Sequence, residues 1–503
     1  MDTFHSLLIG FSVALTFQNL MFAFVGSVLG TLIGVLPGIG SVAGCAMLIP
    51  LSFQMTPTGA IIMLTAIFYG SQYGGTITSV LLNVPGEAAS AITCIDGYQM
   101  TKNGRAGSAL AMAAIGSFVG GTVATMALVL AAKPLTRMAL EFGPVEFFAL
   151  IMLGLSLVMG LAGKSMIKSL MMGIFGLLLA IIGMDPAQGL PRFTFGRLEL
   201  MDGIGFVPVI MGLFGMAEIL ENAEKPFAQV FITKKIGSLI PTRKDLQDSV
   251  GPILRGSAIG TLLGLTPGMT SSAASFLSYI AEKKISKHPE RFGTGMIQGV
   301  VGPEAANNAH ANGALIPLFT LGIPASPTTA VIMGAFMMHG LIPGPLLFKE
   351  HADLVWGVIA SFYVGNVMLL ILNLPLISIW VKILKIPYGI LFGIIMAFMV
   401  VGAYSVSNSV FDVLVMTLFG LIGYFLRKLD FPLAPIVLTL ILGPMMERSL
   451  RQSLEMSQGS LGILLESPIA VVLLVLTALI LIAPAFKFFR RGKEAISGDD
   501  EGA

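Results

Sequence analysis

The sequence is poor in charge. Of its 503 residues, 11% are charged and 55% are hydrophobic, and the mean hydropathy is +0.89. About 25% charged residues is usual in a soluble domain. A water-soluble fold of this length needs more surface charge, so the composition excludes a soluble enzyme and a disordered chain. The 29 basic and 27 acidic residues nearly cancel, so no nucleic acid is expected as a partner.

Cysteines and catalytic motifs are also scarce. Cys45 and Cys94 both lie in apolar stretches, and two such residues give neither a disulfide framework nor a metal-ligand spacing. We interpret them as small buried hydrophobic side chains. Neither HExxH nor GxSxG occurs, so we predict no enzyme, no cofactor and no metal beyond a transported sodium ion. No basic residue precedes Lys102, so a cleaved signal peptide is not expected.

Long apolar segments are abundant instead. A transmembrane helix needs about 20 mostly apolar residues. Because so many such segments follow one another, they predict an all-α polytopic membrane protein rather than buried helices of a soluble fold. The expected spans are 107–131, 143–160, 165–184, 204–221, 356–381, 388–404, 408–426, 431–446 and 467–486. Regions 18–96 and 248–341 are interrupted by Pro, Gly, Asn and Ser, so they are not expected to be plain spans.

Two stretches of the chain resemble each other. GSVLGTLIGVLPG at 26–38 matches GSAIGTLLGLTPG at 256–268 at eight of 13 positions. Further on, Leu82, Pro85 and Ala91 match Leu321, Pro324 and Ala330 at a second, slightly larger offset. Chance similarity between glycine-rich apolar helices is the alternative.

The repeat divides the chain into two predicted homologous halves. The halves are 1–222 (core 18–222) and 248–447, joined by a basic cytoplasmic linker at 223–247 and followed by a C-terminal transmembrane helix and charged cytoplasmic tail at 448–503.

Charge placement predicts that these halves have inverted topology. Loop 54–57 has no basic residue, whereas its counterpart 281–292 has four. Loop 97–107 has two, whereas 341–354 has only Lys349. Under the positive-inside rule, such equivalent loops face opposite sides of the membrane. Alternation through the spans puts 21 of the 29 basic residues in the cytoplasm, together with the C-terminus. Six basic residues do not fit this topology, because the alternation places them on the periplasmic side: Lys133, Arg137, Arg192, Arg197, Arg448 and Arg451.

Four interruptions within these halves are expected to form the functional site. They are LPGIGS (36–41), NVPGEAAS (83–90), TPGMTSS (266–272) and GIPASPTT (322–329). Each contains a proline that ends a helix and small residues that let a ligand approach the backbone. Secondary transporters bind their cargo at such discontinuous helices, where free amides suit an anion and free carbonyls a cation. Kinked helices in tight packing are the alternative, and re-entrant hairpins and broken spans are not distinguished.

The polar residues near these interruptions supply the predicted ligands. The substrate-binding candidates are Pro37, Gly38, Gly40, Ser41, Asn83, Val84, Pro85, Gly86, Pro267, Gly268, Thr270, Ser271, Ser272, Asn308, Asn312, Pro324, Ser326 and Thr328. The coupling-ion candidates are Glu87, Asp96, Glu304 and Asn307, because an acid at membrane depth is costly and usually functional or paired. A helix cap for Glu304 and an interfacial position for Asp96 are the alternatives. His310 is equally well a packing residue or a ligand.

The same stretches carry a family resemblance. GTLIGVLPGIG, YGSQYGGTITSVLLNVPGEAASAITCIDGYQM with the following NGRAG, and PEAANNAHANGALIPLFTLGIPASPTTAV resemble the large membrane subunit of the tripartite tricarboxylate transporters, over about residues 18–445. The resemblance implies a secondary, ion-driven uptake system in a bacterial inner membrane whose substrates are mostly organic carboxylates. It also implies two partners, a small membrane subunit of about four helices and a periplasmic solute-binding protein. His310 stands where a small residue is more usual.

The expected function is therefore that of a permease subunit that imports a di- or tricarboxylate by alternating access. A channel would need a continuous polar pore, which the paired interruptions do not suggest. An intramembrane enzyme would need a catalytic constellation. The sequence leaves open which carboxylate is carried, whether sodium or proton is the coupling ion, and whether the chain forms a homo-oligomer.

Overall fold

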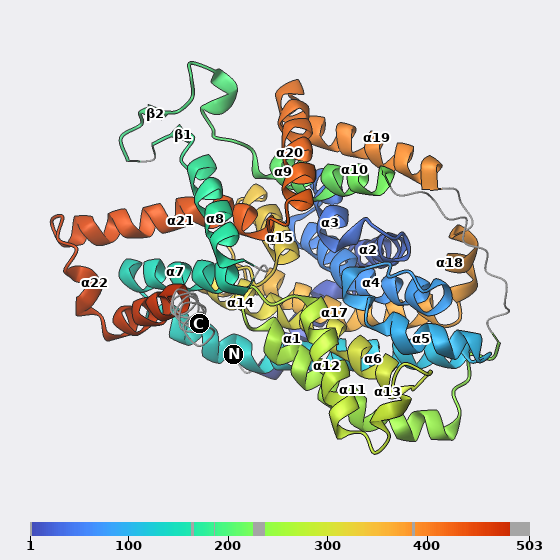
Figure 1. Cartoon of the computed structure of the whole chain (residues 1–503). Helices are drawn as coiled ribbons and strands as arrows, with labels where there is room; N and C mark the ends of the chain where they lie inside the picture. The colour runs from blue at the N-terminus through green and yellow to red at the C-terminus, as the bar shows by residue number, and fades with distance from the viewer. Residues whose placement is uncertain (1–2, 162–164, 186, 225–236, 385–387, 483–503) are drawn as a thin grey trace, which may run out of the picture. The chain divides into compact units, whose positions relative to one another are not determined.

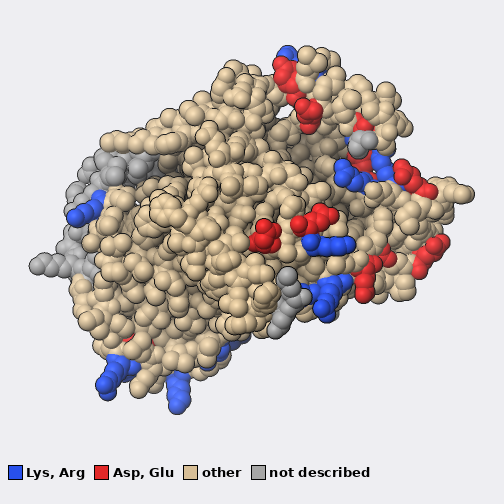
Figure 2. Space-filling model, turned by 180° about the vertical axis from the view of Figure 1, so that it is seen from behind, with Lys and Arg blue, Asp and Glu red and all other residues tan. Residues whose placement is uncertain are grey.

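The chain forms an all-α polytopic membrane protein, as predicted (Figure 1). The computed structural model describes residues 3–161, 165–185, 187–224, 237–384 and 388–482. Among these residues, six helices are long and apolar enough to cross a membrane: Phe17–Val35, Ala106–Leu140, Pro144–Leu161, Phe206–Ala223, Ala352–Asn373 and Val410–Lys428. Figure 2 shows a face on which large areas carry no charged side chain, as expected of a surface in contact with lipid.

The chain folds into two compact units, and each takes segments from both predicted halves. The first unit comprises Met1–Ala139 and Gly205–Phe425, and the second comprises Leu140–Ile204 and Leu426–Ala503. Both units are thus discontinuous in the sequence, and the boundaries of the two homologous halves stay a prediction. Residues 225–236 of the predicted linker and 483–503 of the predicted tail lie outside the described residues.

The elements of the first unit are almost all helices. Its first segment holds α1 (Thr3–Ala14), α2 (Phe17–Val35), α3 (Gly40–Ser52), α4 (Pro57–Leu82), η1 (Ala88–Ser90), α5 (Thr93–Lys102) and α6 (Ala106–Leu140). Its second segment holds α9 (Phe206–Ile210), the π-helical η3 (Met211–Met216), α10 (Ala217–Ala223), α11 (Arg243–Gly264), α12 (Ser271–Ile285), η4 (Pro289–Arg291), α13 (Gln298–Gly313), α14 (Leu315–Leu321), α15 (Pro327–Met338), α16 (Pro345–Glu350), α17 (Ala352–Asn373), α18 (Ile377–Ile383), α19 (Tyr388–Ser407) and α20 (Val410–Lys428).

Helices α2 and α3 form a hairpin whose first leg lies parallel to α4. Glycines make this close approach possible, because a Cβ at Gly30 would lie 2.6 Å from the Ile67 carbonyl oxygen and one at Gly34 would lie 2.1 Å from that of Ser71. Both partners advance by one helical turn in the same direction, so the helices run parallel. Helix α3 then returns, and its Cys45 thiol contacts the Leu64 carbonyl oxygen.

Helices α11 and α12 form a second hairpin built in the same way against α13. A Cβ at Gly260 would lie 2.1 Å from the Ala306 carbonyl oxygen, and one at Gly264 would lie 2.7 Å from that of His310. Gly260 and Gly264 match Gly30 and Gly34 at the first offset of the sequence repeat. Ala306 and His310, whose carbonyl oxygens they contact, match Ile67 and Ser71 at the second offset. The repeated residues therefore make equivalent helix contacts.

The two hairpins begin at opposite ends of α6. The first begins beside α17, where Thr58, at the start of α4, lies next to Gly357. The second begins at Asp245, which pairs with Arg105 immediately before α6. Lys133, near the far end of α6, lies over the ring of Trp356 on α17. At 1.5 Å per residue the rise from the start of α6 to Lys133 is about 40 Å, which exceeds the ≈ 30 Å hydrocarbon core of a bilayer.

One expected span is wrong. The sequence predicts a single span over 356–381, but α17 ends at Asn373 and α18 begins at Ile377. Pro375 removes a backbone donor and restricts Leu374 before it, which ends the helix. The Trp380 indole then donates to the Leu372 carbonyl oxygen at 2.9 Å and fixes the bend.

The second unit combines helices with an irregular connection between residues 181 and 204. It contains α7 (Pro144–Leu161), α8 (Met166–Ala180), β1 (Gly183–Met184), β2 (Pro191–Arg192), η2 (Leu198–Leu200), α21 (Ala434–Met456), α22 (Ile463–Glu466) and the helix Pro468–Ile482. Helix α21 packs along α7 and α8. At Gly176 a Cβ would lie 2.1 Å from the Thr439 hydroxyl oxygen, so this glycine permits the close contact between α8 and α21.

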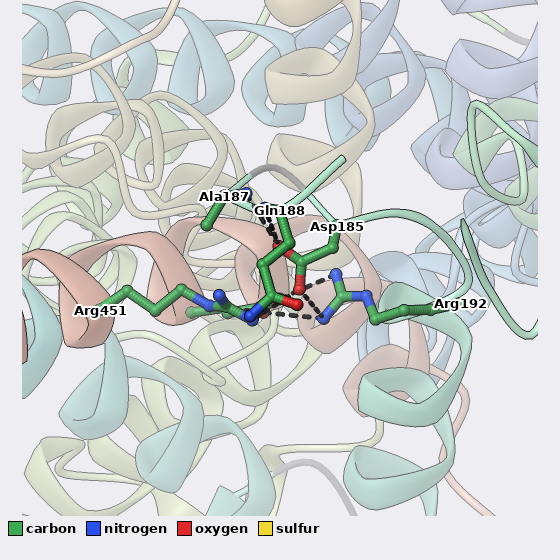
Figure 3. Close-up of polar contacts among 6 residues, drawn as sticks. Asp185, Ala187, Gln188, Arg192 and Arg451 are labelled. Carbon is green, nitrogen blue, oxygen red and sulfur yellow. Dashed lines mark hydrogen bonds and ion pairs between the residues drawn. The ribbon is translucent and has the colours of Figure 1, made fainter. Parts of the chain in front are cut away.

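Ion pairs hold the connection against α21 (Figure 3). Asp185 accepts from the Ala187 and Gln188 amides at 2.8 and 2.9 Å, and its second oxygen pairs with Arg451 at 2.8 Å. Arg192 pairs with Glu447 at 2.8 Å. Hydrogen bonds from the Gln188 and Ala187 amides hold the pKa of the Asp185 carboxyl below its usual value, with a further contribution from Arg451.

We expect the connection to loosen at acid pH. Because the pKa of Asp185 is lowered by folding, its contribution to stability is complete above the usual aspartate pKa of about 4 and is lost as the pH falls through the lowered value. The measurement is hydrogen exchange at the Ala187 and Gln188 amides, corrected for intrinsic rates. Protection should be constant from neutral pH to about 5 and fall in stronger acid. Asp185→Asn should lower it already at neutral pH, whereas Asp202→Asn, whose carboxylate makes no hydrogen bond among the described residues, should not. Equal protection in all three proteins would contradict the assignment.

Candidate functional site

The tip of the first hairpin is a tight turn with exposed backbone groups. Gly38 and Gly40 have φ of +88° and +65°, values that glycine adopts without strain. The Asn222 side chain donates to the Gly38 carbonyl oxygen at 2.9 Å. At the start of α3, the Ser41 amide donates to the Glu87 carboxylate at 2.8 Å. A free helix N-terminus thus meets an acid from the second interruption. The preceding Pro37 is half-buried.

The second interruption follows α4. Asn83 closes that helix in the left-handed conformation with φ of +59°. Gly86 packs against α2, since a Cβ there would lie 2.0 Å from the Gly34 carbonyl oxygen. Glu87 then precedes η1. Asn83, Val84 and Pro85 are exposed, so this interruption is accessible in the described conformation.

The tip of the second hairpin repeats the turn of the first. Gly268 has φ of +87°, close to that of Gly38, and its amide donates to the Ala325 carbonyl oxygen at 2.9 Å. His310 lies 3.0 Å from the Ser271 hydroxyl through Nδ1 and 3.1 Å from the Met269 carbonyl oxygen through Nε2. Since a carbonyl oxygen only accepts, Nε2 carries the proton and Nδ1 accepts from the hydroxyl. His310 therefore braces this tip.

Three further predicted residues belong to the same tip. Thr270 caps α12 by accepting from the Ala273 amide at 3.2 Å. Pro267 and Ser272 are half-buried beside it.

The fourth interruption is the counterpart of the second. Gly322 closes α14 with φ of +71°, as Asn83 closes α4. Ser326 caps α15 in a reciprocal pair of hydrogen bonds with Thr329. Gly322, Pro324, Ser326 and Thr328 are all buried. Asn83 and Pro85, the counterparts of Gly322 and Pro324, are exposed, so the two interruptions differ in access.

The four interruptions meet in space. The Ser41 hydroxyl, at the first tip, lies 3.2 Å from the Thr328 hydroxyl, on the first turn of α15. The second tip meets the fourth interruption through Gly268 and Ala325. Segments that are far apart in the chain therefore come together at one polar centre. Hydrogen bonds therefore connect all four interruptions, while their role in binding substrate stays a prediction.

A second polar centre surrounds Glu304, which has no exposed surface. Its two carboxylate oxygens accept from the Thr76 and Thr93 hydroxyls, each at 2.5 Å. The Asn307 amide adds a third hydrogen bond at 3.1 Å. Glu304 lies in the middle of α13, so it is not a helix cap. Hydroxyls from the first predicted half thus bind an acid from the second.

The other two asparagines of α13 are engaged away from the interruptions. Asn308 donates to the Glu304 carbonyl oxygen at 3.1 Å and to Asn307 at 2.6 Å. Asn312 donates to the Gly121 carbonyl oxygen and the Thr125 hydroxyl of α6, at 3.0 and 3.2 Å. Their assignment to the substrate stays a prediction.

Asp96 is fully buried and is surrounded by donors. One carboxylate oxygen accepts from the amides of Gly293, Gly295 and Met296 at 2.8–2.9 Å, and the other accepts from the Tyr279 hydroxyl at 2.9 Å. Four donors satisfy this carboxylate without a cation. We therefore interpret Asp96 as an anchor between α5 and the segment before α13, and its coupling-ion role stays a prediction.

Sequence reasoning missed several residues of these centres. Asn222 and Glu218 reach the first tip from α10, and a Cβ at Gly40 would lie 3.8 Å from the Glu218 carboxylate. Both lie near the end of the apolar span Phe206–Ala223 and are far from the turn in the sequence, so no local pattern connects them. Thr76 and Thr93 lie inside a recognisable motif, but hydroxyls in a membrane helix usually bond to their own backbone. The described residues contain no group of three or more acids, histidines or cysteines able to hold a metal ion.

The protein has long apolar helices and two buried polar centres, and its hairpin tips meet its helix breaks. These features define a polytopic membrane protein with discontinuous helices. The chain belongs to the tripartite tricarboxylate transporter TctA family, which matches residues 20–438. The resemblance that the sequence motifs suggested is thereby confirmed.

Two relatives from Agrobacterium vitis support the assignment. One, described as an uncharacterized 52.8 kDa protein in the TAR-I ttuC' 3' region, is 48% identical over 474 residues, which cover 94% of each chain. Another, described as an uncharacterized protein in the TAR-II ttuC' 3' region, is 44% identical over 242 residues, which cover 48% of this chain and all of the relative. No solved structure matches the chain significantly.

Family membership makes the chain a membrane subunit of a tricarboxylate transporter, one component of a tripartite system. It points to transport rather than catalysis.

Proposed function

We propose that the chain is the permease subunit of a binding-protein-dependent secondary transporter, which imports an organic di- or tricarboxylate by alternating access, driven by a sodium or proton gradient. The observation that carries this proposal is the meeting of four helix interruptions at one polar centre. Hairpin tips and broken helices leave backbone amides and carbonyls without helical partners, and such groups bind cargo at membrane depth.

The arrangement of the hairpins supports an inverted repeat. The two hairpins make equivalent glycine contacts and begin at opposite ends of α6. Two homologous halves of opposite orientation would produce this arrangement. The returning legs α3 and α12 have 13 and 15 residues, about 20–23 Å, which is short of a bilayer core. Both hairpins therefore fit re-entrant segments better than pairs of full spans.

The difference in access between the halves supports alternating access. Asn83 and Pro85 are exposed, whereas their counterparts Gly322 and Pro324 are buried. In a symmetric pair of halves, exchange of these two environments would open the site to the other side of the membrane.

The substrate is proposed to bind between the hairpin tips and the helix breaks. The first turns of α3 and α15 present amides and hydroxyls, notably Ser41 and Thr328, which suit a carboxylate. Glu87, beside the same turn, and Glu304, buried on α13, are the proposed coupling-ion residues. No cofactor is proposed.

The proposed setting is a bacterial inner membrane with the C-terminus in the cytoplasm. The proposed partners are a small membrane subunit and a periplasmic solute-binding protein. The predicted linker 223–247 is too short to fold into a capture domain, so high-affinity uptake should require the separate binding protein.

Reconstitution tests the function. The chain, its small membrane subunit and its binding protein are placed in liposomes, and uptake of labelled carboxylates is measured under sodium and proton gradients. Saturable accumulation that requires all three proteins and one gradient supports the proposal. Non-saturating flux without accumulation indicates a channel instead, and high-affinity uptake by this chain alone contradicts the partner assignment.

Topology gives an independent prediction. After replacement of the two buried cysteines, single cysteines at Gly104 and Ser286 should react with an impermeant maleimide only from the cytoplasmic side, and one at the exposed Ile342 only from the periplasmic side. The reason is that loop 97–107 adjoins the segment that directly follows loop 281–292, where the Asn103 side chain donates to the Thr294 carbonyl oxygen at 3.2 Å. Labelling of the Ser286 and Ile342 positions from one side would overturn the inverted arrangement.

A further inference from the structure

Glu304 has no positive partner among the described residues. The neighbouring charges on α11 and α12, Arg255 and Glu282, pair with each other at 2.6 Å. Asp96, on α5, is held by backbone amides. The titratable groups on the remaining neighbours are neutral: Tyr73 on α4, Cys94 on α5 and His310 on α13.

Taking a bare carboxylate out of water has a large free-energy cost. Hydroxyl and amide hydrogen bonds offset part of that cost, so this site favours a state in which a bound cation removes the charge.

The hydrogen bonds around Glu304 suit a proton. Each carboxylate oxygen lies 2.5 Å from a hydroxyl oxygen, a spacing that accommodates a proton between the two oxygens but no metal ion. The Thr76 hydroxyl also has a second acceptor, the Gln72 carbonyl oxygen, at 3.5 Å. A hydroxyl has one proton and can donate to only one of the two at a time.

These contacts define two states with the same heavy-atom positions. When Glu304 is ionised, Thr76 donates to its carboxylate. When Glu304 is protonated, the acid donates to the Thr76 oxygen and Thr76 donates to Gln72. We propose that Glu304 is the proton-binding carboxylate of the coupling step and that Thr76 is its hydrogen-bond switch. This inference rests on the proposed transport function and selects the proton over sodium at this site.

There is room for a water molecule beside Thr76. A cavity large enough for one water molecule is lined by Thr76 together with Tyr73, Ser117 and Asn373. The side-chain carbonyl oxygen of Asn373 is buried there without a partner in the described residues. A water molecule in the cavity would satisfy this oxygen and reach Thr76.

Protonation would also change the contact between the two predicted halves. Glu304 lies on α13, while Thr76 and Thr93 lie on α4 and α5. Hydrogen bonds to an ionised group are roughly twice as strong as neutral ones. The proton therefore weakens the two hydroxyl contacts that join these helices, and this links proton binding to relative movement of the halves.

Infrared spectroscopy of the purified full-length chain tests the inference without requiring transport. The difference between spectra at acid and alkaline pH should contain a carboxylic-acid C=O band that is absent in Glu304→Gln. Thr76→Val should shift this band, because its hydrogen-bond partner is removed. Thr78→Val is the matched control, since among the described residues the Thr78 hydroxyl bonds only to the Gly75 carbonyl oxygen of its own helix, at 3.2 Å, and it should leave the band in place. Glu87→Gln should retain the band as well.

The inference is overturned if the wild-type and Glu304→Gln difference spectra coincide, or if added sodium at constant pH removes the band, which would mark a sodium site. If Glu304→Gln fails to fold, the comparison of Thr76→Val with Thr78→Val tests the proposal instead. Identical difference spectra of these two variants would overturn it.

Transport separates this inference from the proposed function. With both partner subunits in liposomes, Glu304→Gln should exchange carboxylate for carboxylate but not accumulate it under a proton gradient. Full proton-driven accumulation by this variant overturns the proton site and leaves the function intact. A Glu304 band in a protein that transports no carboxylate supports the proton site and contradicts the function.

Discussion

Transport should stop when the first hairpin tip is locked to α15. The Ser41 and Thr328 hydroxyl oxygens lie 3.2 Å apart, so sulfur atoms in their place can reach bonding distance with little adjustment. In a Ser41→Cys, Thr328→Cys protein that lacks the two native cysteines, oxidation should reduce uptake to background. Reduction should restore it. The physical reason is that alternating access requires these segments, which belong to different halves, to separate in each cycle.

A second cysteine pair controls for disulfide formation itself. The Ser79 and Ser90 hydroxyl oxygens lie 2.8 Å apart, but both belong to the first half. A bond between cysteines at these positions should leave uptake largely unchanged. If the Ser41–Thr328 bond forms quantitatively and uptake continues, the two segments do not separate during transport and the proposed site is wrong.

Alanine at the helix-contact glycines should severely destabilise the protein. A Cβ at Gly260 would lie 2.1 Å from the Ala306 carbonyl oxygen, and one at Gly30 would lie 2.6 Å from that of Ile67. Each contact is with backbone, which cannot turn aside, so the helices must move apart. Overpacking of this kind costs about 1–3 kcal/mol or more. The measurement is thermal stability of the purified chain by size-exclusion chromatography after heating.

Gly393→Ala is the matched control, because a Cβ there meets nothing within 4 Å. Alanine is favoured over glycine in a helix by about 1 kcal/mol, so this variant should be as stable as the wild type or more so. Equal stability of all three variants would show that the close parallel contacts of α2 with α4 and of α11 with α13 do not form.

The sequence predicts the interruptions well because their causes are local. Pro37, Pro85, Pro267 and Pro324 each stand where a helix cannot continue, and the structure has a break at each. Residues that match in the sequence repeat also make matching helix contacts. The reason is that the glycines, spaced one per helical turn, are themselves the residues that let the helices pack closely. The span over 356–381 was mispredicted because mean hydropathy outweighed a single proline.

The features that could not be predicted from the sequence depend on contacts with residues far along the chain. A hairpin and a pair of spans have the same hydropathy, and it is the lengths of the returning legs α3 and α12, 13 and 15 residues, that favour the hairpin. The role of His310 was open because a histidine in an apolar helix gives no indication of its partners. Once Ser271 and Met269 lie on either side of the ring, it is a brace for the second tip. Asp96 has the composition of an ion ligand, but its four donors come from residues far along the chain.

The parallel pairing of α2 with α4 has a consequence for how the chain is made. The glycine-lined side of α2 has no partner until the carbonyls of α4 emerge, and α2 ends at Val35 whereas α4 ends at Leu82. At a synthesis rate of about 5–20 residues per second, this delay is roughly 2–9 s. During that time the first hairpin must wait at the translocon or at the bilayer surface, and α11 waits for α13 in the same way. Biosynthesis of this protein should therefore depend on a holding step, twice in one chain, that ordinary sequential insertion of spans does not need.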